Sequence, residues 1–366
     1  MAGLSCGIVG LPNVGKSTLF NALTSSSQAS ASNYPFCTID PNVGVVEVED
    51  ARLNVLGKIA KSEKIVPAVT EFVDIAGLVA GASKGEGLGN AFLSNIRNTD
   101  AIIQVVRCFE SEDIVHVRGD LDPIQDIDII SLELVLADLT TCENNIAKLE
   151  RQAKSQKEAA VSLSALQKAK NHLDQNLPVR TLELSKEEKA LLSAYRFLTE
   201  KDVLYVCNIA EKDLHNTENP MVEQVQKRAD QEGAKVLVLC AELESEIAQL
   251  EPKERPAYLE SLGLKESGLT KLIKASFEML GLISFITSGE METKAWTIHK
   301  GMTAVEAAGK IHTDIQRGFI RAEVITYDDI VQYGGRLGAK EAGKVRSEGK
   351  EYVVQDGDVV LFLHSR

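Results

Sequence analysis

The chain has 366 residues, and this length predicts two or three domains. Apolar residues make up 44% of it, which excludes global disorder, because disordered chains combine low hydrophobicity with high net charge. The formal net charge of −13 disfavours a protein that coats nucleic acid through its overall field, although a local basic patch stays open.

The first 130 residues alternate short apolar runs with helical patterns. A buried strand at Leu4–Val9 leads into a glycine-rich loop, and a helix follows over Thr18–Thr24. Further strands are predicted at Val43–Val48, Ala68–Ile75, Ala101–Val106, Val203–Cys207 and Lys235–Leu239. Apolar strands that alternate with helices predict an α/β fold, with a parallel sheet covered on both faces.

The segment between the predicted strands at Ala101–Val106 and Val203–Cys207 has a different hydrophobic pattern. From Leu132 to Ala153 apolar residues recur in steps of three or four, and a second such arm runs from Leu163 to Leu173. Pro178 then ends the helical pattern. We expect a hairpin of two long helices over residues 131–200. It is inserted into the first domain, because the strand at Val203 resumes that domain.

A third region begins near Leu282. Strands are predicted at Ala295–Ile298, Arg321–Ile325 and Val359–Leu363, with a helix at Thr303–Ile311. Thr303 suits the N-cap position of that helix, and Glu306 completes a capping box. We therefore expect a nucleotide-binding domain over residues 1–280, which carries the hairpin, and a small mixed α/β domain over residues 281–366.

The loop after the first strand carries a complete Walker A pattern, Gly10-x4-Gly15-Lys16-Ser17. In such a loop glycines let backbone N–H groups surround phosphates, a lysine reaches the β and γ phosphates, and a serine binds Mg²⁺. The alternative is a glycine turn with a lone surface lysine, which the flanking strand and helix disfavour. The residues expected to contact the nucleotide here are Asn13, Val14, Gly15, Lys16, Ser17 and Thr18.

Asp74 ends the strand that begins at Ala68, and Gly77 follows in an Asp-x-x-Gly pattern. A carboxylate there holds the hydrated metal, and the glycine N–H approaches the γ-phosphate. Thr38 lies between the two motifs and suits a switch threonine that completes the Mg²⁺ shell, or it is an ordinary loop threonine. We predict Mg²⁺ ligands at Ser17, Thr38 and Asp74.

The position after Gly77 is Leu78, where Ras-like GTPases carry a water-orienting glutamine. Leucine cannot hydrogen-bond a water molecule, so intrinsic hydrolysis should be slow unless another group positions the water. His116 is a candidate for that role, and a structural histidine near a strand is the alternative. The predicted catalytic residues are therefore Lys16, Gly77 and His116.

The base-reading motif departs from the Asn-Lys-x-Asp pattern that selects guanine. Its counterpart is Asn208-Ile209-Ala210-Glu211, directly after the strand at Val203. Glu211 is one methylene longer than the aspartate, and Ile209 replaces the lysine stem that packs on the base. These changes weaken the case for GTP and favour ATP. We expect Asn208, Ile209, Glu211 and, from the later loop, Ala241 to form the base pocket.

The six cysteines form no C-x-x-C pair and follow no metal-ligand spacing. Most stand among apolar residues, which favours buried thiols in a reducing compartment. No basic start followed by an apolar core marks a signal peptide. No apolar run reaches the roughly 20 residues that span a bilayer. The sequence thus predicts a soluble, cytoplasmic protein with no membrane partner, and no long heptad repeat requires a dimer.

Together these motifs resemble the YchF/Obg-like ATPase family of Obg-related P-loop proteins. The resemblance rests on Gly10–Thr18, Asp74–Leu78 and Asn208–Glu211, and it extends over the whole chain. The hairpin falls where that family has its coiled-coil insertion. The segments Ala295–Thr297 and Gln355–Asp358 look like parts of its TGS domain, a ubiquitin-like β-grasp fold.

The resemblance implies an ATPase with relaxed or reversed base preference that binds ribosomes or their subunits and carries a hydrophobic residue at Leu78. Together with the altered base motif, this makes ATP the preferred nucleotide over GTP. Some members of the wider class hold K⁺ with an asparagine at the position of Asn13. A GTP-specific Obg-like GTPase and a small-molecule P-loop kinase remain the alternatives. The narrow apolar seam of the hairpin suits a docking arm better than the arginine-bearing lid of a kinase.

The tip of the predicted hairpin is basic. Between Lys148 and Lys170 six basic residues face two acidic ones, which gives a local charge of +4. The basic residues are Lys148, Arg151, Lys154, Lys157, Lys168 and Lys170. They form either a solvated helical face or one basic arm that meets ribosomal RNA in a salt-sensitive way. The net charge of the chain therefore excludes nonspecific coating of RNA but not local contact.

Overall fold

The computed structural model describes residues 4–27, 42–75, 87–110, 121–152, 157–216 and 218–365. By its packing the chain divides into two compact units. The first contains residues 1–44 and 71–272, and the second contains residues 45–70 and 273–366. Residues 45–70 thus pack with the C-terminal segment, whereas the sequence suggested one domain boundary near residue 280.

The strands of the first unit belong to a six-stranded sheet with the order β2-β4-β1-β5-β6-β7. Neighbouring strands from β4 through β1, β5 and β6 to β7 run parallel, as predicted. The strands β1, β5 and β6 are buried along their whole length, which explains their nearly continuous apolar sequence. The strands are β1 (Ser5–Val9), β2 (Val43–Val48), β4 (Ala68–Asp74), β5 (Ala101–Arg107), β6 (Val203–Asn208) and β7 (Lys235–Leu239).

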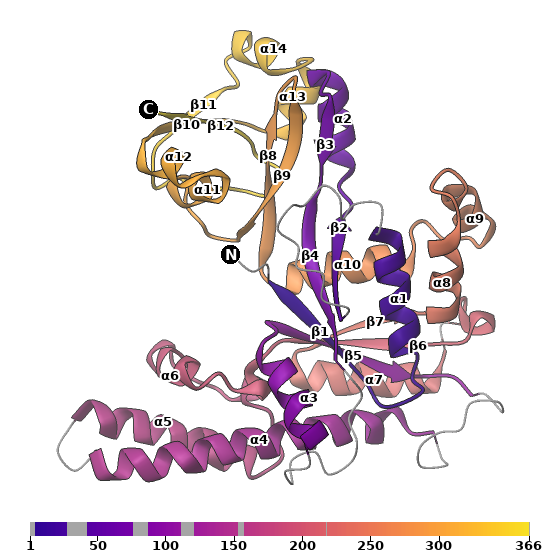
Figure 1. The fold of residues 1–366 in the computed structure, drawn as a ribbon, viewed down its shortest axis with the longest axis vertical. Helices are drawn as coiled ribbons and strands as arrows, with labels where there is room; N and C mark the ends of the chain where they lie inside the picture. Colours follow the sequence, from indigo (N-terminus) through magenta and orange to yellow (C-terminus); the bar gives the residue numbers. More distant parts are fainter. Residues whose placement is uncertain are drawn as a thin grey trace. The chain divides into compact units, whose positions relative to one another are not determined.

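Helices follow the strands of this sheet in the chain. Local signals set their ends: Asn219 caps α7 by accepting from the N–H of Met221 at 3.0 Å, and Gly233 ends it in the left-handed region. In Figure 1, α1 and α8 lie side by side. The helices are α1 (Lys16–Ser27), α3 (Gly87–Arg97), α7 (Pro220–Glu232), α8 (Ala241–Gln249), α9 (Arg255–Ser261) and α10 (Gly268–Met279).

The inserted helical hairpin is present. Its arms α4 (Pro123–Gln152) and α5 (Lys157–Leu173) lie side by side (Figure 1), and β5 and β6 pair directly although the hairpin separates them in the chain. The predicted seam is buried at Val135, Cys142 and Leu173, among others. The first arm begins at Pro123, earlier than predicted, because its first turns are buried too. The return to β6 contains α6 (Lys186–Leu192) and short 3₁₀ turns, including η3 (Val179–Thr181), η4 (Ser193–Tyr195) and η5 (Leu198–Glu200).

The second unit contains a mixed sheet with the order β11-β10-β12-β8-β9-β3. Its core includes Phe285, Phe319 and Phe362 and is closed by α11 (Ala304–Ile311), whose predicted capping box forms. The Thr303 N–H donates to Glu306 Oε2 at 2.8 Å. The strands are β3 (Lys64–Val66), β8 (Leu282–Ser288), β9 (Glu292–His299), β10 (Phe319–Ile325), β11 (Arg346–Glu348) and β12 (Val359–His364). Three further helices are α12 (Thr313–Arg317), α13 (Tyr327–Gln332) and α14 (Arg336–Glu341).

Two elements of the second unit that were not predicted come from the N-terminal part of the chain. The helix α2 (Ala51–Ala60) contacts β8 and β9, and β3 pairs in parallel with β9 at the edge of the sheet. Arg52, on α2, binds Asp50 through its Nη2 and Asp356 through its Nη1, each at 2.8 Å. A segment that precedes the C-terminal region by more than 200 residues is therefore part of the same packed unit.

The described cysteines are reduced and buried, as expected; they are Cys6, Cys108, Cys142, Cys207 and Cys240. Burial raises the pKa of the Cys142 thiol to about 12. Within the described ranges, no helix combines the length and the apolarity needed to cross a membrane.

Candidate functional site

The Walker loop connects β1 to α1. Gly15 has a φ of +96° and Asn13 has a φ of 65°, so the loop turns twice through the left-handed region before Lys16 begins the helix. The Gly15 carbonyl accepts the first helical hydrogen bond, from the Leu19 N–H at 3.0 Å. Backbone N–H groups at the start of α1 therefore have no helical partner and can bind phosphate oxygens.

Gly15 is required by its neighbours as well as by its backbone angle. A Cβ atom at this position would lie 2.3 Å from Nδ2 of Asn208. At Gly10 a Cβ would lie 2.8 Å from Cγ2 of Val14 and 3.0 Å from the Val105 carbonyl oxygen. The two glycines of the Walker pattern thus let the loop pack closely on β5 and on the end of β6.

Lys16 and Asp74 meet at this loop. The Lys16 Nζ forms an ion pair with Asp74 Oδ1, and the side chains are 10% and 21% exposed. The contact follows from the topology, because β1 and β4 are parallel neighbours and Ile8 is in register with Asp74. The sequence placed both residues in the phosphate site, and the structure brings them into direct contact.

Asn208 holds three segments of the site together. Its side chain is buried at the end of β6, where its Nδ2 donates to the Val14 carbonyl at 2.9 Å. Its Oδ1 accepts from the Ala241 N–H, also at 2.9 Å. One amide thereby links the Walker loop, β6 and the start of α8. Sequence reasoning gave Asn208 a base-binding role but did not reveal this bridge, because the partners are distant in the chain.

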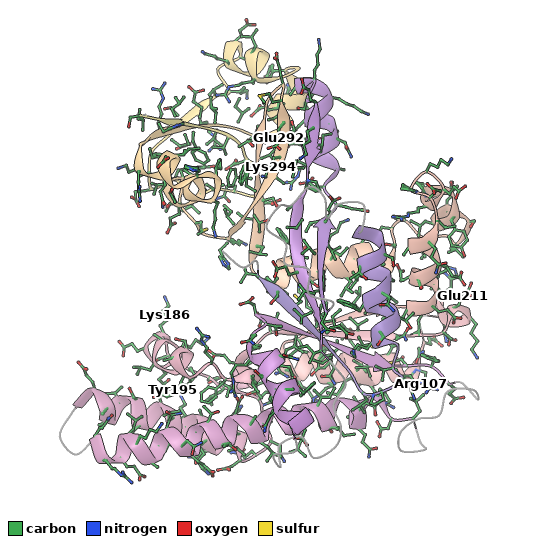
Figure 2. All side chains as sticks on the ribbon, viewed as in Figure 1. Arg107, Lys186, Tyr195, Glu211, Glu292 and Lys294 are labelled. Atoms are coloured by element: carbon green, nitrogen blue, oxygen red, sulfur yellow. The ribbon has the colours of Figure 1, made fainter. Side chains whose placement is uncertain are left out.

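The remaining candidates for the base pocket differ in exposure. Ile209 and Ala241 are buried at 5% and 2% exposure, and the Ile209 N–H donates to the Leu239 carbonyl at 2.9 Å. Glu211 is exposed and begins a short 3₁₀ turn after β6 (Figure 2). The Ile209 side chain thus packs inside the protein, and Glu211 is the carboxylate of this motif that solvent reaches.

The exposed residues of the loop complete the phosphate site. Asn13, Ser17 and Thr18 are solvent-accessible, whereas Val14 is buried. A hydroxyl at Ser17 and a carboxylate at Asp74 are oxygen ligands, which Mg²⁺ prefers. Among the described residues no group of three or more His, Cys, Asp and Glu side chains could hold a metal. The Ser17 hydroxyl and the Asp74 carboxylate fit a Mg²⁺ ion whose other ligands are phosphate oxygens.

Several predicted residues lie outside the part of the chain that the structure describes. They are Thr38, Gly77, Leu78 and His116. The structure also places a buried cation beside the site: Arg107 ends β5, in register with Asn208 on β6 (Figure 2), and its burial was not predicted. Its guanidinium is buried, its Nε donates to the Phe109 carbonyl at 3.1 Å, and its charge lies 4.7 Å from the Phe109 ring centroid. A charged residue that ends an apolar strand was the available signal.

Two family models match separate parts of the chain. The model YchF-GTPase_C, described as a protein of unknown function (DUF933), matches residues 282–365. The model MMR_HSR1, described as a 50S ribosome-binding GTPase, matches residues 5–137. The second match includes the Walker loop and Asp74.

Proteins named ribosome-binding ATPase YchF are similar to this chain over nearly its whole length. The one from Haemophilus influenzae is 54% identical over 361 residues, which cover 98% of this chain and 99% of the relative. The one from Bacillus subtilis is also 54% identical over 361 residues, and these cover 98% of each chain. The structure of the Schizosaccharomyces pombe YchF GTPase has a TM-score of 0.90 and 37% identity, and the match covers 99% of this chain and 98% of that one. The similarity therefore includes both compact units.

Proposed function

Because this chain belongs to the YchF family of P-loop NTPases, we propose that it is a ribosome-associated ATPase whose bound nucleotide acts as a switch. The observation that carries this proposal is the phosphate site, where Lys16 and Asp74 are in contact beside a loop held by Asn208. The relatives named above are ribosome-binding ATPases by name, which supports both the reaction and the partner. Ribosome binding would place this activity in the cytoplasm.

In the proposed reaction Lys16 binds the β and γ phosphates of ATP, and the free N–H groups at the start of α1 bind the same oxygens. Ser17, Asp74 and the predicted Thr38 would hold Mg²⁺, which supplies positive charge to the phosphates when it is bound. Gly77 would approach the γ-phosphate, and His116 would position the attacking water. A requirement for K⁺ at Asn13 also belongs to this proposal.

The preference for ATP rests on the motif that follows β6. The Asn208 side chain donates to the Val14 carbonyl of the Walker loop and accepts from the Ala241 N–H. It therefore cannot turn toward the base without breaking these two hydrogen bonds. Glu211 replaces the aspartate that would accept from both N1–H and N2–H₂ of guanine, and its longer side chain displaces that carboxylate. Adenine has no such pair of donors, so it loses nothing by the replacement. This argument favours ATP over GTP.

We expect ATP to compete for the site more strongly than GTP and to be converted to ADP and free phosphate. The check is displacement of a fluorescent ATP analogue by each nucleotide, together with analysis of the products. Tighter binding of GTP would favour an Obg-like GTPase and remove the argument from Glu211. A phosphorylated small molecule among the products would indicate a kinase.

The basic hairpin tip is the proposed contact with ribosomal RNA. Two of its described lysines form ion pairs. The Lys168 Nζ lies 3.4 Å from Glu188 Oε2, and the Lys170 Nζ lies 2.9 Å from Asp174 Oδ2. These partners neutralise part of the predicted charge. Lys148 and Arg151 are exposed near the end of α4 and provide the charge that RNA phosphates would meet.

We expect the chain to sediment with ribosomes more strongly with an ATP analogue than with ADP, and less at higher salt. The double variant Lys148→Gln/Arg151→Gln should weaken this association. The matched control is Lys227→Gln/Lys253→Gln, which removes two exposed charges elsewhere. Equal sedimentation in every nucleotide state would contradict the switch. An unaffected tip variant would make the tip a solvated helical face.

A further inference from the structure

A polar pocket lies on the first unit at the sheet edge opposite the Walker loop. It has a volume of about 540 Å³ and is lined by the loop before β5 and by the segment before β6. These strands are parallel, so their starts share one edge, whereas the Walker loop follows the end of their parallel neighbour β1. Nucleotides bind at the carboxyl ends of such strands. This pocket is therefore separate from the ATP site.

Two guanidinium groups line the pocket. Arg97 is the last residue of α3, and Arg196 follows η4 in the left-handed region, with a φ of 50°. Both side chains are exposed, and neither forms a hydrogen bond or ion pair with another residue that the structure describes. An arginine presents donors in a planar fork that matches the oxygens of a phosphate group. Two guanidinium groups without a hydrogen bond or ion pair among the described residues thus line one pocket, and the charge of Arg97 also acts on Asp138.

A third basic residue, Lys201, also lines the pocket. Its Nζ donates to the Thr99 carbonyl and lies 3.5 Å from the Arg97 carbonyl, so it is fixed at the end of α3. Burial lowers the pKa of Lys201, and the positive charge of Arg196 lowers it further. Lys201 is therefore held in place, while Arg97 and Arg196 remain free to contact a ligand.

Three carboxylates also line the pocket: Asp100, Glu200 and Asp202. Asp100 accepts from the Ser5 N–H at 2.9 Å, and its charge raises the pKa of Lys201 against the lowering by burial. Burial raises the pKa of Glu200, and the nearby Asp138 raises it further. Asp202 is the remaining carboxylate of the pocket. Arg97 and Arg196 are the donors that an anionic ligand would meet in this pocket, and the charges of its carboxylates oppose such a ligand.

We propose that this pocket is a second, phosphate-binding site, in which Arg97 and Arg196 together bind one phosphate group. The site does not depend on ATP hydrolysis. It lies at the root of the helical hairpin, because Phe197, the residue after Arg196, is part of the hairpin core. The phosphate belongs either to an RNA backbone or to a phosphorylated small molecule, and the same chemistry recognises both.

The test is calorimetric titration of the full chain with inorganic phosphate, after the Walker site has been filled with a nonhydrolysable ATP analogue and Mg²⁺. The variant Arg97→Gln/Arg196→Gln should weaken phosphate binding by at least about tenfold, since it removes two charged donors. The variant Asp202→Asn should strengthen binding, because it removes one of the opposing charges. Changes of opposite sign cannot both come from misfolding.

The matched control is Lys300→Gln/Arg317→Gln, which removes two exposed positive charges from the second unit and should leave phosphate affinity unchanged. Rates of ATP hydrolysis should be the same in all these variants. Phosphate binding that is absent in the unaltered chain, or equal in the Arg97→Gln/Arg196→Gln variant, overturns the proposal.

A second measurement identifies the source of the phosphate. Anisotropy of a labelled, short single-stranded RNA is recorded with the same variants and with added phosphate. If the arginine variant loses RNA affinity and phosphate competes with RNA, the ligand is an RNA backbone. If RNA binding is unchanged while phosphate binding is lost, the ligand is a phosphorylated small molecule.

Discussion

The Lys16→Ala variant is expected to lose tight nucleotide binding, with an affinity for ATP at least about 100-fold below that of the unaltered chain. Lys16 is the one cation in the described part of the Walker loop, and it is buried at the start of α1 in contact with Asp74. Its removal leaves the β and γ phosphates without their charged donor, and Asp74 then repels them. Equilibrium titration with a fluorescent ATP analogue measures the loss.

Lys58→Ala is the control for this experiment, because Lys58 is an exposed lysine on α2. It should bind ATP as the unaltered chain does. Circular dichroism should show that both variants keep their secondary structure. An unchanged affinity in Lys16→Ala would mean that nucleotide binds elsewhere on the chain.

The Glu232→Ala variant is expected to lose about 3–5 kcal/mol of stability, because it leaves buried cations without their partner. Glu232, at the end of α7, accepts from Arg180 and Arg228, and Tyr205 Oη donates to its Oε2 at 3.0 Å. The side chains of Arg180 and Glu232 are 10% and 6% exposed. The network ties the segment after the hairpin to α7 and to β6. Urea denaturation of the full chain, followed by circular dichroism, measures the effect.

Glu232→Gln should be milder, since an amide oxygen still accepts from Tyr205. Glu223→Ala, an exposed change on the same helix, should have little effect. A stability of Glu232→Ala close to that of Glu223→Ala would contradict a structural role for this network.

The same network predicts acid sensitivity. Burial alone would raise the pKa of Glu232, but Arg180 and Arg228 outweigh burial and hold that pKa below its usual value. A carboxylate with a lowered pKa stabilises the fold above its unfolded value, near 4.3, and this contribution is lost as the pH falls through the folded pKa. In Glu232→Ala this part of the acid destabilisation should be missing.

Much of the fold was predictable because its signals are local. The parallel strands are continuous apolar runs, and the hairpin has apolar residues at regular steps of three or four. The capping box at Thr303 marks the start of its helix. The helix α2 and the strand β3 were missed because nothing near them in the chain reveals what they pack against. The partner of β3 is β9, and Lys64 is in register with Glu292.

The phosphate site was predictable for a similar reason, since the Walker pattern is contiguous and Asp74 ends a recognisable strand. The bridge through Asn208 was not, because it joins Val14 to Ala241 across the whole nucleotide-binding part of the chain. The phosphate pocket at Arg97 and Arg196 was likewise hidden, since the two arginines carry no motif and meet only in the folded chain.

The strands β3 and β4 are adjacent in the chain but belong to different sheets. Pro67, between them, has no N–H to continue a ladder, so the chain can change sheets at this residue. A C-terminal fragment that starts at residue 281 would lack α2 and β3. Its β9 would then present an unpaired edge, which invites pairing between molecules. The C-terminal region is therefore not a detachable module: gene fusions or domain shuffling that move it alone would carry an incomplete, aggregation-prone unit.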